Sequence, residues 1–274
     1  MSHRIAVGSQ ASNGKGRGMA VIIALCNQKG GVGKTTSTVN LGAALAEQGQ
    51  RILMVDLDPQ AALTAYWGLH EPLPEPTLYR LLSDSRTPVQ SALRSVRTTI
   101  DVIPSDIDLA AAEIELFSAL GRERILKEVL DPLADVYDFV LIDCPPNLGL
   151  LTINALVAAH GVIVPLQCEY FALRGLSMLL DTLAKVKRRL NPQLEITGIL
   201  PTLYNGRTRH AKEVLEEVRG MFGERVFDTV IRTSIRFAES TVAHQPILEF
   251  APKHVGAQSY RSLAKEILDD TNTQ

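Results

Sequence analysis

A glycine-rich segment stands between an apolar run and a helical pattern near the start of the chain. The run AVIIALC (20–26) is apolar without alternation, which is typical of a strand buried in a parallel sheet. The segment GGVGKTT (30–36) follows it, and residues 35–48 are predicted to form a helix. A strand, a glycine turn and a helix N-terminus in this order present backbone N–H groups to a phosphate. The arrangement predicts a nucleotide site in an α/β fold.

The residue types of this loop suit a polyphosphate. Its three glycines let N–H groups converge on phosphate oxygens without obstruction by Cβ atoms. Lys34 supplies a cation for the terminal phosphates, and the hydroxyl of Thr35 supplies a ligand for Mg²⁺. The residues of the loop predicted to bind nucleotide are Gly30, Gly31, Val32, Gly33, Lys34, Thr35 and Thr36.

The loop departs from the common phosphate-loop pattern at its start. That pattern has a glycine where this chain has Gln28, and Lys29 follows as an additional lysine. Because Lys34 already provides a cation, the second lysine needs a separate explanation.

Further apolar runs alternate with helical patterns along the chain. Strands are predicted at 51–58, 100–105, 138–144, 161–167 and 194–200, and helices near 108–118, 121–131, 148–159, 173–190, 207–222 and 256–269. This alternation predicts a single α/β domain with a mostly parallel central sheet covered by helices on both faces. Together with the phosphate loop, it predicts the fold class of a P-loop NTPase. The predicted organisation is a flexible arm at 1–18, one domain at 19–270 and a polar tail at 271–274.

Three carboxylates end predicted strands. Asp56 and Asp58 close the strand RILMVDLD, and Asp143 closes FVLID. Ligands of open α/β sheets bind outside the carboxyl ends of the strands, so these side chains are expected at the edge that carries the loop. They predict a shared site for Mg²⁺ and water.

Composition excludes several classes of protein. Hydrophobic residues make up 46% and charged residues 21%, and the net charge of −2 argues against a globally basic nucleic-acid binder. No apolar run approaches the ~18 residues of a membrane span, and the N-terminal segment lacks the centre of a signal peptide, so a cytoplasmic protein is expected. Cys26, Cys144 and Cys168 lie in apolar contexts and are expected to be small buried residues.

Four segments together closely resemble the ParA/Soj family of partition ATPases, within the deviant Walker A group that includes MinD. They are KGGVGKTT, VDLDPQ, LIDCPPNLG and PLQCEYFALRGL, and the resemblance spans residues 20–268. It implies a slow, partner-stimulated ATPase that hydrolyses ATP to ADP with Mg²⁺ and segregates a chromosome or a plasmid. It also implies an ATP-dependent homodimer and a ParB-like centromere-binding partner.

The resemblance assigns roles to individual residues. Lys29 matches the lysine that reaches across the dimer to the partner's nucleotide, and Lys34 serves its own nucleotide. Asp58 matches the residue that positions or activates water, and Asp143 matches the Walker B residue. The implied catalytic residues are Lys29, Lys34, Asp58 and Asp143, and the implied metal-site residues are Thr35, Asp58 and Asp143.

Base and DNA contacts follow from the same resemblance. Pro201 and Asn205 are implied to lie at the adenine pocket. Arg207 and Arg236 match positions that bind double-stranded DNA without sequence preference, which implies association with the nucleoid. A second basic run, KVKRRL (185–190), is either another patch or the solvated face of a helix, and we favour the solvated face.

Two alternatives remain open. A MinD-like regulator needs a basic amphipathic C-terminal helix, whereas the ending SLAKEILDDTNTQ is acidic and polar, which predicts no membrane binding. A nucleotide-dependent scaffold that binds ATP but barely hydrolyses it fits the same loop.

Overall fold

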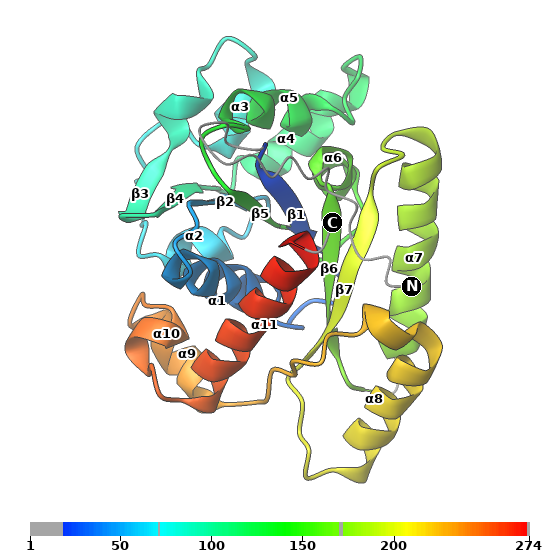
Figure 1. Cartoon of the computed structure of the whole chain (residues 1–274). Coiled ribbons are helices and arrows are strands. Elements are labelled where there is room, and N and C mark those ends of the chain that lie inside the picture. Colours follow the sequence, from blue (N-terminus) through cyan, green and yellow to red (C-terminus); the bar gives the residue numbers. More distant parts are fainter. Residues whose placement is uncertain (1–18, 71, 170–171, 273–274) are drawn as a thin grey trace.

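A seven-stranded sheet runs through the centre of the protein (Figure 1). The computed structural model describes residues 19–70, 72–169 and 172–272. The strand order is β3-β4-β2-β5-β1-β6-β7, and all neighbours are parallel except the antiparallel pair β3 and β4. The strands are β1 (Val21–Leu25), β2 (Ile52–Asp56), β3 (Arg94–Arg97), β4 (Ile100–Ile103), β5 (Phe139–Asp143), β6 (Gly161–Gln167) and β7 (Glu195–Thr202).

The central strands are buried on both faces because their sequences are continuously apolar, with an aspartate only at the last position of β2 and β5. All five residues of β1, of β2 and of β5 are buried. The register pairs Leu25 of β1 with Asp143 of β5, and Asp143 in turn with Asp56 of β2. The carboxyl ends of these strands therefore meet at one edge, which is where the phosphate loop and the carboxylates were predicted.

Helices cover both faces of the sheet, so two separate cores form. One face carries α1 (Lys34–Glu47), α2 (Ala62–Tyr66), α9 (Ile235–Val242), α10 (Ile247–Phe250) and α11 (Val255–Asn272), with α1 and α11 packed side by side (Figure 1). The other face carries α3 (Leu78–Ser83), α4 (Leu109–Glu115), α5 (Ile125–Leu130), α6 (Leu150–Ala158), α7 (Ala172–Arg189) and α8 (Arg209–Phe222). The predicted fold class is confirmed.

Several elements differ from the sequence-based expectation. Strand β3 was not predicted because its sequence, RSVR, has no apolar periodicity. The helices α2, α3, α9 and α10 are too short to produce a clear 3.6-residue pattern. Helix α11 continues to Asn272 and includes two of the four residues predicted as a tail, while the predicted arm at 1–18 lies outside the described residues.

Across residues 19–70, 72–169 and 172–272, every helix is too short or too polar to cross a bilayer.

Candidate nucleotide-binding site

The loop between β1 and α1 has the backbone geometry of a phosphate cradle. Gly31 and Gly33 have φ angles of 73° and 86°, a left-handed conformation that side chains with a Cβ disfavour. Gly33 is also the N-cap of α1, so the free N–H groups of the first turn open onto the loop. The loop and the helix dipole therefore favour an anion at the same place.

Hydrogen bonds from neighbouring strands hold the loop in place. The amide of Asn27 donates to the carbonyl of Pro165 in β6 (2.7 Å), and its oxygen accepts from the N–H of Lys29 (2.9 Å). On the other side, the hydroxyl of Thr202 in β7 donates to the carbonyl of Val32 (2.7 Å). These hydrogen bonds hold the loop in place without a ligand, which lowers the conformational-entropy cost of binding.

The two loop lysines lie in different environments. Lys34 is buried, and its Nζ donates to the carbonyl of Lys29 (3.5 Å), which keeps the amine over its own loop. The side chain of Lys29 is 47% exposed, and its Nζ donates to Gln167 Oε1 (3.0 Å) and Glu169 Oε2 (2.6 Å). Both acceptors belong to the segment at the carboxyl end of β6. Lys34 therefore stays with its own loop, whereas Lys29 is held by a neighbouring segment.

Asp143 and Thr35 bring two oxygen atoms together beside the loop. The hydroxyl of Thr35 donates to Oδ2 of Asp143 (2.6 Å), and Thr38 donates to Oδ1 (3.4 Å). Burial, reinforced by the nearby carboxylate of Asp56, raises the pKa of Asp143 to about 8. A carboxylate that burial makes unfavourable is stabilised by a cation beside it.

This oxygen pair fits Mg²⁺ that arrives with a nucleotide. Within the part of the chain that the structure describes, no group of three or more His, Cys, Asp or Glu side chains is placed to hold a metal alone. Mg²⁺ is usually bound by one or two protein oxygens together with phosphate oxygens and water. Thr35 and Asp143 match that donor set.

The aspartates after β2 have distinct environments. Asp56 is fully buried and accepts hydrogen bonds from the N–H (2.8 Å) and hydroxyl (2.7 Å) of Thr64, and burial raises its pKa to about 6. It also accepts from the N–H of Asp58 (3.3 Å), and Ser105 donates to the carbonyl of Asp58 (2.8 Å). Asp56 therefore orders the turn, and Asp58 is left partly exposed with a carboxylate that accepts from the N–H of Gln60 (3.0 Å).

Sequence reasoning missed some supporting residues. Thr64 and Ser105 order the Asp58 turn, but neither belongs to a recognisable pattern. Gln167 and Glu169 lie inside the quoted segment PLQCEYFALRGL, directly after a strand, and their position at the carboxyl end of β6 was a usable signal.

The segment that carries Pro201 and Asn205 is joined to a second segment that includes Ile231. The N–H of Tyr204 donates to Ile231 (3.0 Å), and the N–H of Ile231 donates to Pro201 (2.8 Å). Pro201 is buried, whereas Asn205 is exposed and uses its side-chain oxygen to accept from the N–H of Arg207 (3.1 Å). Asn205 therefore has a local role in the turn, and its contact with adenine stays a prediction.

The two arginines expected to bind DNA are both exposed but differ in their contacts. Arg207 lies in the turn between β7 and α8, and among the described residues its guanidinium has no ion-pair partner. Arg236 lies in the first turn of α9 and pairs with Glu239 (2.9 Å), with its side chain 54% exposed. Arg207 thus presents the freer charge.

The cysteines agree with the prediction. Cys26, Cys144 and Cys168 are all buried and free, and Cys26 and Cys144 lie side by side with their Sγ atoms 2.9 Å apart.

The chain is similar in sequence to proteins of known families. Residues 20–196 match the family model described as an AAA domain. The chain is 46% identical to the sporulation initiation inhibitor protein Soj of Bacillus subtilis, over 91% of this chain and 98% of that protein. It is 43% identical to the chromosome partitioning protein ParA of Myxococcus xanthus, over 97% and 95% of the two chains.

A solved structure extends the comparison to bound ligands. The crystal structure of cobyrinic acid a,c-diamide synthase from Mycobacterium smegmatis with ADP and magnesium is 41% identical, with a TM-score of 0.82 over 93% of this chain and 96% of that chain. The fold, the loop and the relatives agree, and the chain belongs to the ParA/Soj family of partition ATPases.

Proposed function

We propose that the protein is a Mg²⁺-dependent ATPase that forms a homodimer when it binds ATP and thereby binds DNA. The coarser activity, a P-loop ATPase of the partitioning family, follows from the match to Soj and ParA. The dimer, the DNA and the order of events are the parts that we propose here.

The observation that carries the proposal is the position of Lys29. Its side chain is 47% exposed, and its amine is held by Glu169, away from the position that Lys34 occupies over the loop. Two polyphosphates facing each other across an interface repel, and a cation supplied by each subunit to the other offsets that repulsion. Lys29 is the exposed loop cation available for this purpose, and comparable arginines supplied in trans accelerate other nucleotide hydrolases by roughly 10³–10⁵.

Asp58 and Asp143 have separate roles in the proposed hydrolysis. When bound, Mg²⁺ would be held by Thr35 and Asp143 and would offset charge on the phosphates. Asp58, ordered by Asp56 and partly exposed, orients the attacking water and accepts its proton. Val32 and Thr36 complete the cradle through their backbone N–H groups, and the Pro201–Asn205 segment contacts the base.

DNA binding follows from dimerisation in this proposal. Arg207 and Arg236 contact phosphates, and non-specific contacts of this kind have Kd values of about 10⁻⁴–10⁻⁶ M. Two such surfaces in one dimer raise the apparent affinity by about 10²–10⁴ when both engage. ATP binding would then place the protein on the nucleoid, and hydrolysis stimulated by a ParB-like protein would release it.

A single experiment separates the steps. Light scattering and DNA gel shift are performed with ADP, with ATP and with a slowly hydrolysed ATP analogue. We expect a monomer without DNA binding in ADP, and a DNA-bound dimer with the analogue. Binding of DNA by a monomer in ADP would contradict the proposal.

The comparisons suggest a competing activity to test in parallel. The relative from M. smegmatis is named as a synthase that acts on cobyrinic acid. ATP turnover that rises with cobyrinic acid and not with DNA would favour that activity. A MinD-like regulator would bind vesicles in ATP, and a scaffold would dimerise without turnover under any of these conditions.

A further inference from the structure

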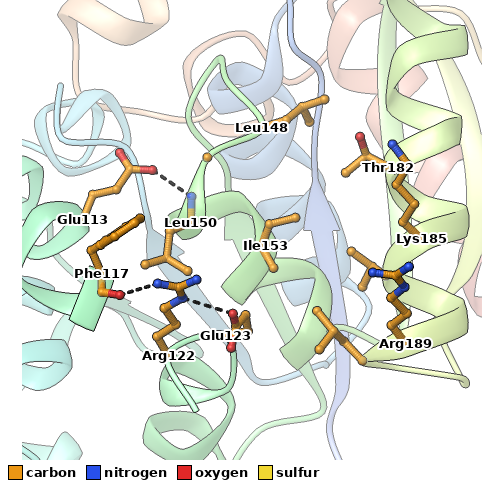
Figure 2. A pocket seen from close by; sticks show the side chains of 13 residues that line it. Glu113, Phe117, Arg122, Glu123, Leu148, Leu150, Ile153, Thr182, Lys185 and Arg189 are labelled. Carbon is orange, nitrogen blue, oxygen red and sulfur yellow. Dashed lines mark hydrogen bonds and ion pairs between the residues drawn. The ribbon is translucent and has the colours of Figure 1, made fainter. Parts of the chain in front are cut away.

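A cavity of about 500 Å³ lies between α6 and α7 and the segment that follows α4, apart from the phosphate loop. Figure 2 shows Phe117, Arg122 and Leu150 on one side of it and Lys185 and Arg189 on the other. Its apolar lining consists of Phe117, Leu148, Leu150, Ile153, Val186 and Leu190. Neither the nucleotide nor the proposed DNA contacts use this surface.

The acidic groups at the cavity are already occupied. Glu113 accepts from the N–H of Leu150 (2.8 Å), and Glu123 accepts from the guanidinium of Arg122 (3.1 Å). The same guanidinium lies over the ring of Phe117, with Cζ 4.8 Å from the ring centroid. The charge of Glu123 is thus balanced by Arg122, and Glu113 is held by a backbone N–H.

The two cations of the opposite wall are not balanced. Lys185 and Arg189 are exposed, and among the residues that the structure describes neither has a hydrogen-bond or ion-pair partner. Lys187, in the same helix, pairs with Glu195 and does not line the cavity. The cations of the basic run at 185–190 therefore lie in different environments. Two of them, Lys185 and Arg189, line the mostly apolar cavity (Figure 2). The interpretation of this run as only a solvated helix face is incomplete.

Apolar surface continues beyond the cavity. Phe117 is 72% exposed although it is a large aromatic side chain, and Ile114 and Leu120 in the same segment are 79% and 100% exposed. Exposed apolar side chains gathered at one place mark interaction sites. Aromatic and arginine side chains, such as Phe117 and Arg189 on the two walls of this cavity, are enriched where proteins bind proteins.

We propose that this cavity binds an acidic amphipathic segment of a partner protein. Apolar side chains of that segment enter the cavity against Phe117, and two carboxylates pair with Lys185 and Arg189. The two cations are four residues apart on α7, a spacing of about 5–6 Å between Cβ atoms. Glu or Asp residues four apart on a partner helix have the same spacing, so both pairs form at once.

A short stretch of chain connects the lining of the cavity to the nucleotide site. Leu148, Gly149 and Leu150 line it, and they follow Asp143 by only a few residues. The N–H of Leu150 is held by Glu113, itself a wall of the cavity. A bound segment therefore lies against the loop that leads to the metal-site carboxylate.

The test uses random peptides of about four helical turns displayed on phage and selected on the full chain. The best peptide is labelled, and its affinity is measured by fluorescence anisotropy at low and high salt. We expect selected peptides to combine apolar residues with Glu or Asp at a four-residue spacing. Their affinity should fall at least about tenfold in the double variant Lys185→Glu with Arg189→Glu, and also in Phe117→Ser.

Arg188→Glu is the matched control, because Arg188 is an exposed cation of the same helix turn that does not line the cavity. It should leave peptide affinity within about twofold, and nucleotide binding by every variant verifies the fold. Failure to select acidic peptides, or equal binding to the double variant and the control, would overturn the proposal. Binding of short duplex DNA that depends on Lys185 and Arg189 would reassign the surface to nucleic acid.

Discussion

The Nζ atom of Lys29 lies 2.6 Å from Oε2 of Glu169 in the same chain. The amine that we propose to serve a partner's nucleotide is therefore held by a carboxylate of its own subunit. In the dimer that we propose, contacts to the partner's phosphates would replace this ion pair. Glu169 would then compete with the phosphate for the same amine and oppose dimer formation.

Replacing Glu169 by Gln should favour the dimer. The amide removes the charge and keeps the shape, so Lys29 is released at little cost to the fold. Because exposed ion pairs are weak, we expect the midpoint of ATP-dependent dimerisation to shift by roughly two- to fivefold toward lower protein concentration. Light scattering measures this, with the exposed Glu216→Gln in α8 as the matched control. Identical midpoints for the two variants would rule out the competition.

Substitutions of the two loop lysines should have different effects on nucleotide binding and dimerisation. Lys34→Ala removes the cation held over the cradle and should abolish nucleotide binding. Lys29→Ala leaves the cradle intact and should retain nucleotide binding while the dimer is lost. Equilibrium dialysis with labelled ATP and light scattering separate the two effects. A normal dimer fraction in Lys29→Ala would exclude its role in trans.

Asp58→Ala should separate dimer formation from turnover. Asp56 and Ser105 still order the turn, so ATP binding remains while the attacking water loses its acceptor. General-base groups contribute about 10²–10⁴ in rate, and we expect a loss of that order together with an accumulated ATP-bound dimer. Turnover is measured as phosphate release, and near-normal turnover would refute the assignment.

Binding of Mg²⁺-nucleotide should strengthen as the pH rises toward 8. Burial raises the pKa of Asp143 to about 8, so below that pH the free protein holds a proton that the metal must displace. Release of one proton gives up to about a tenfold gain in affinity per pH unit below the pKa. Calorimetry at several pH values measures the slope. The substitution Asp143→Asn should reduce the dependence of the affinity on pH. The same dependence in both proteins would show that the released proton comes from the nucleotide.

Thr64→Val should destabilise the fold. Its buried hydroxyl donates to Asp56 (2.7 Å) and accepts from the N–H of Ser105 (2.9 Å), so valine removes one of the hydrogen bonds to the buried carboxylate and the acceptor of the Ser105 N–H. A loss of about 2–4 kcal/mol in the free energy of unfolding is expected. Urea denaturation measures it against Thr182→Val, whose hydroxyl only bonds back to its own helix. An equal loss of unfolding free energy in both variants would mean that the hydrogen bonds around Asp56 do not stabilise the fold.

Replacing Arg207 by Glu should weaken binding to all DNA sequences alike. The side chain is exposed and has no ion pair among the described residues, so its charge is available to phosphates. Arg236→Glu should have a smaller effect because Glu239 already pairs with Arg236 (2.9 Å). Gel shift against Arg225→Glu, which changes the net charge equally, measures the difference. Dimerisation in ATP should be unchanged in all three variants.

The sequence predicted the parts of the protein whose signals are local. The apolar runs of β1, β2 and β5 have no other stable place than a sheet buried on both faces, and the strand ends that carry Asp56 and Asp143 follow from parallel order. Tertiary contacts could not be predicted in the same way. The partner of Lys29 is a residue 140 positions away, and Thr64 supports Asp56 from a helix of five residues.

The two outer strands of the sheet have a consequence for how copies of the protein associate. An open sheet edge can pair with another chain and aggregate. Here β3 has only four residues, two of them arginines, and Arg97 pairs with Glu249 (2.7 Å). At the other edge, the N–H of Phe227 donates to the carbonyl of Ile199 in β7 (3.0 Å). Both edges are unfavourable for the addition of a strand, so the dimer that we propose would form through loops and side chains and not as a continuous sheet.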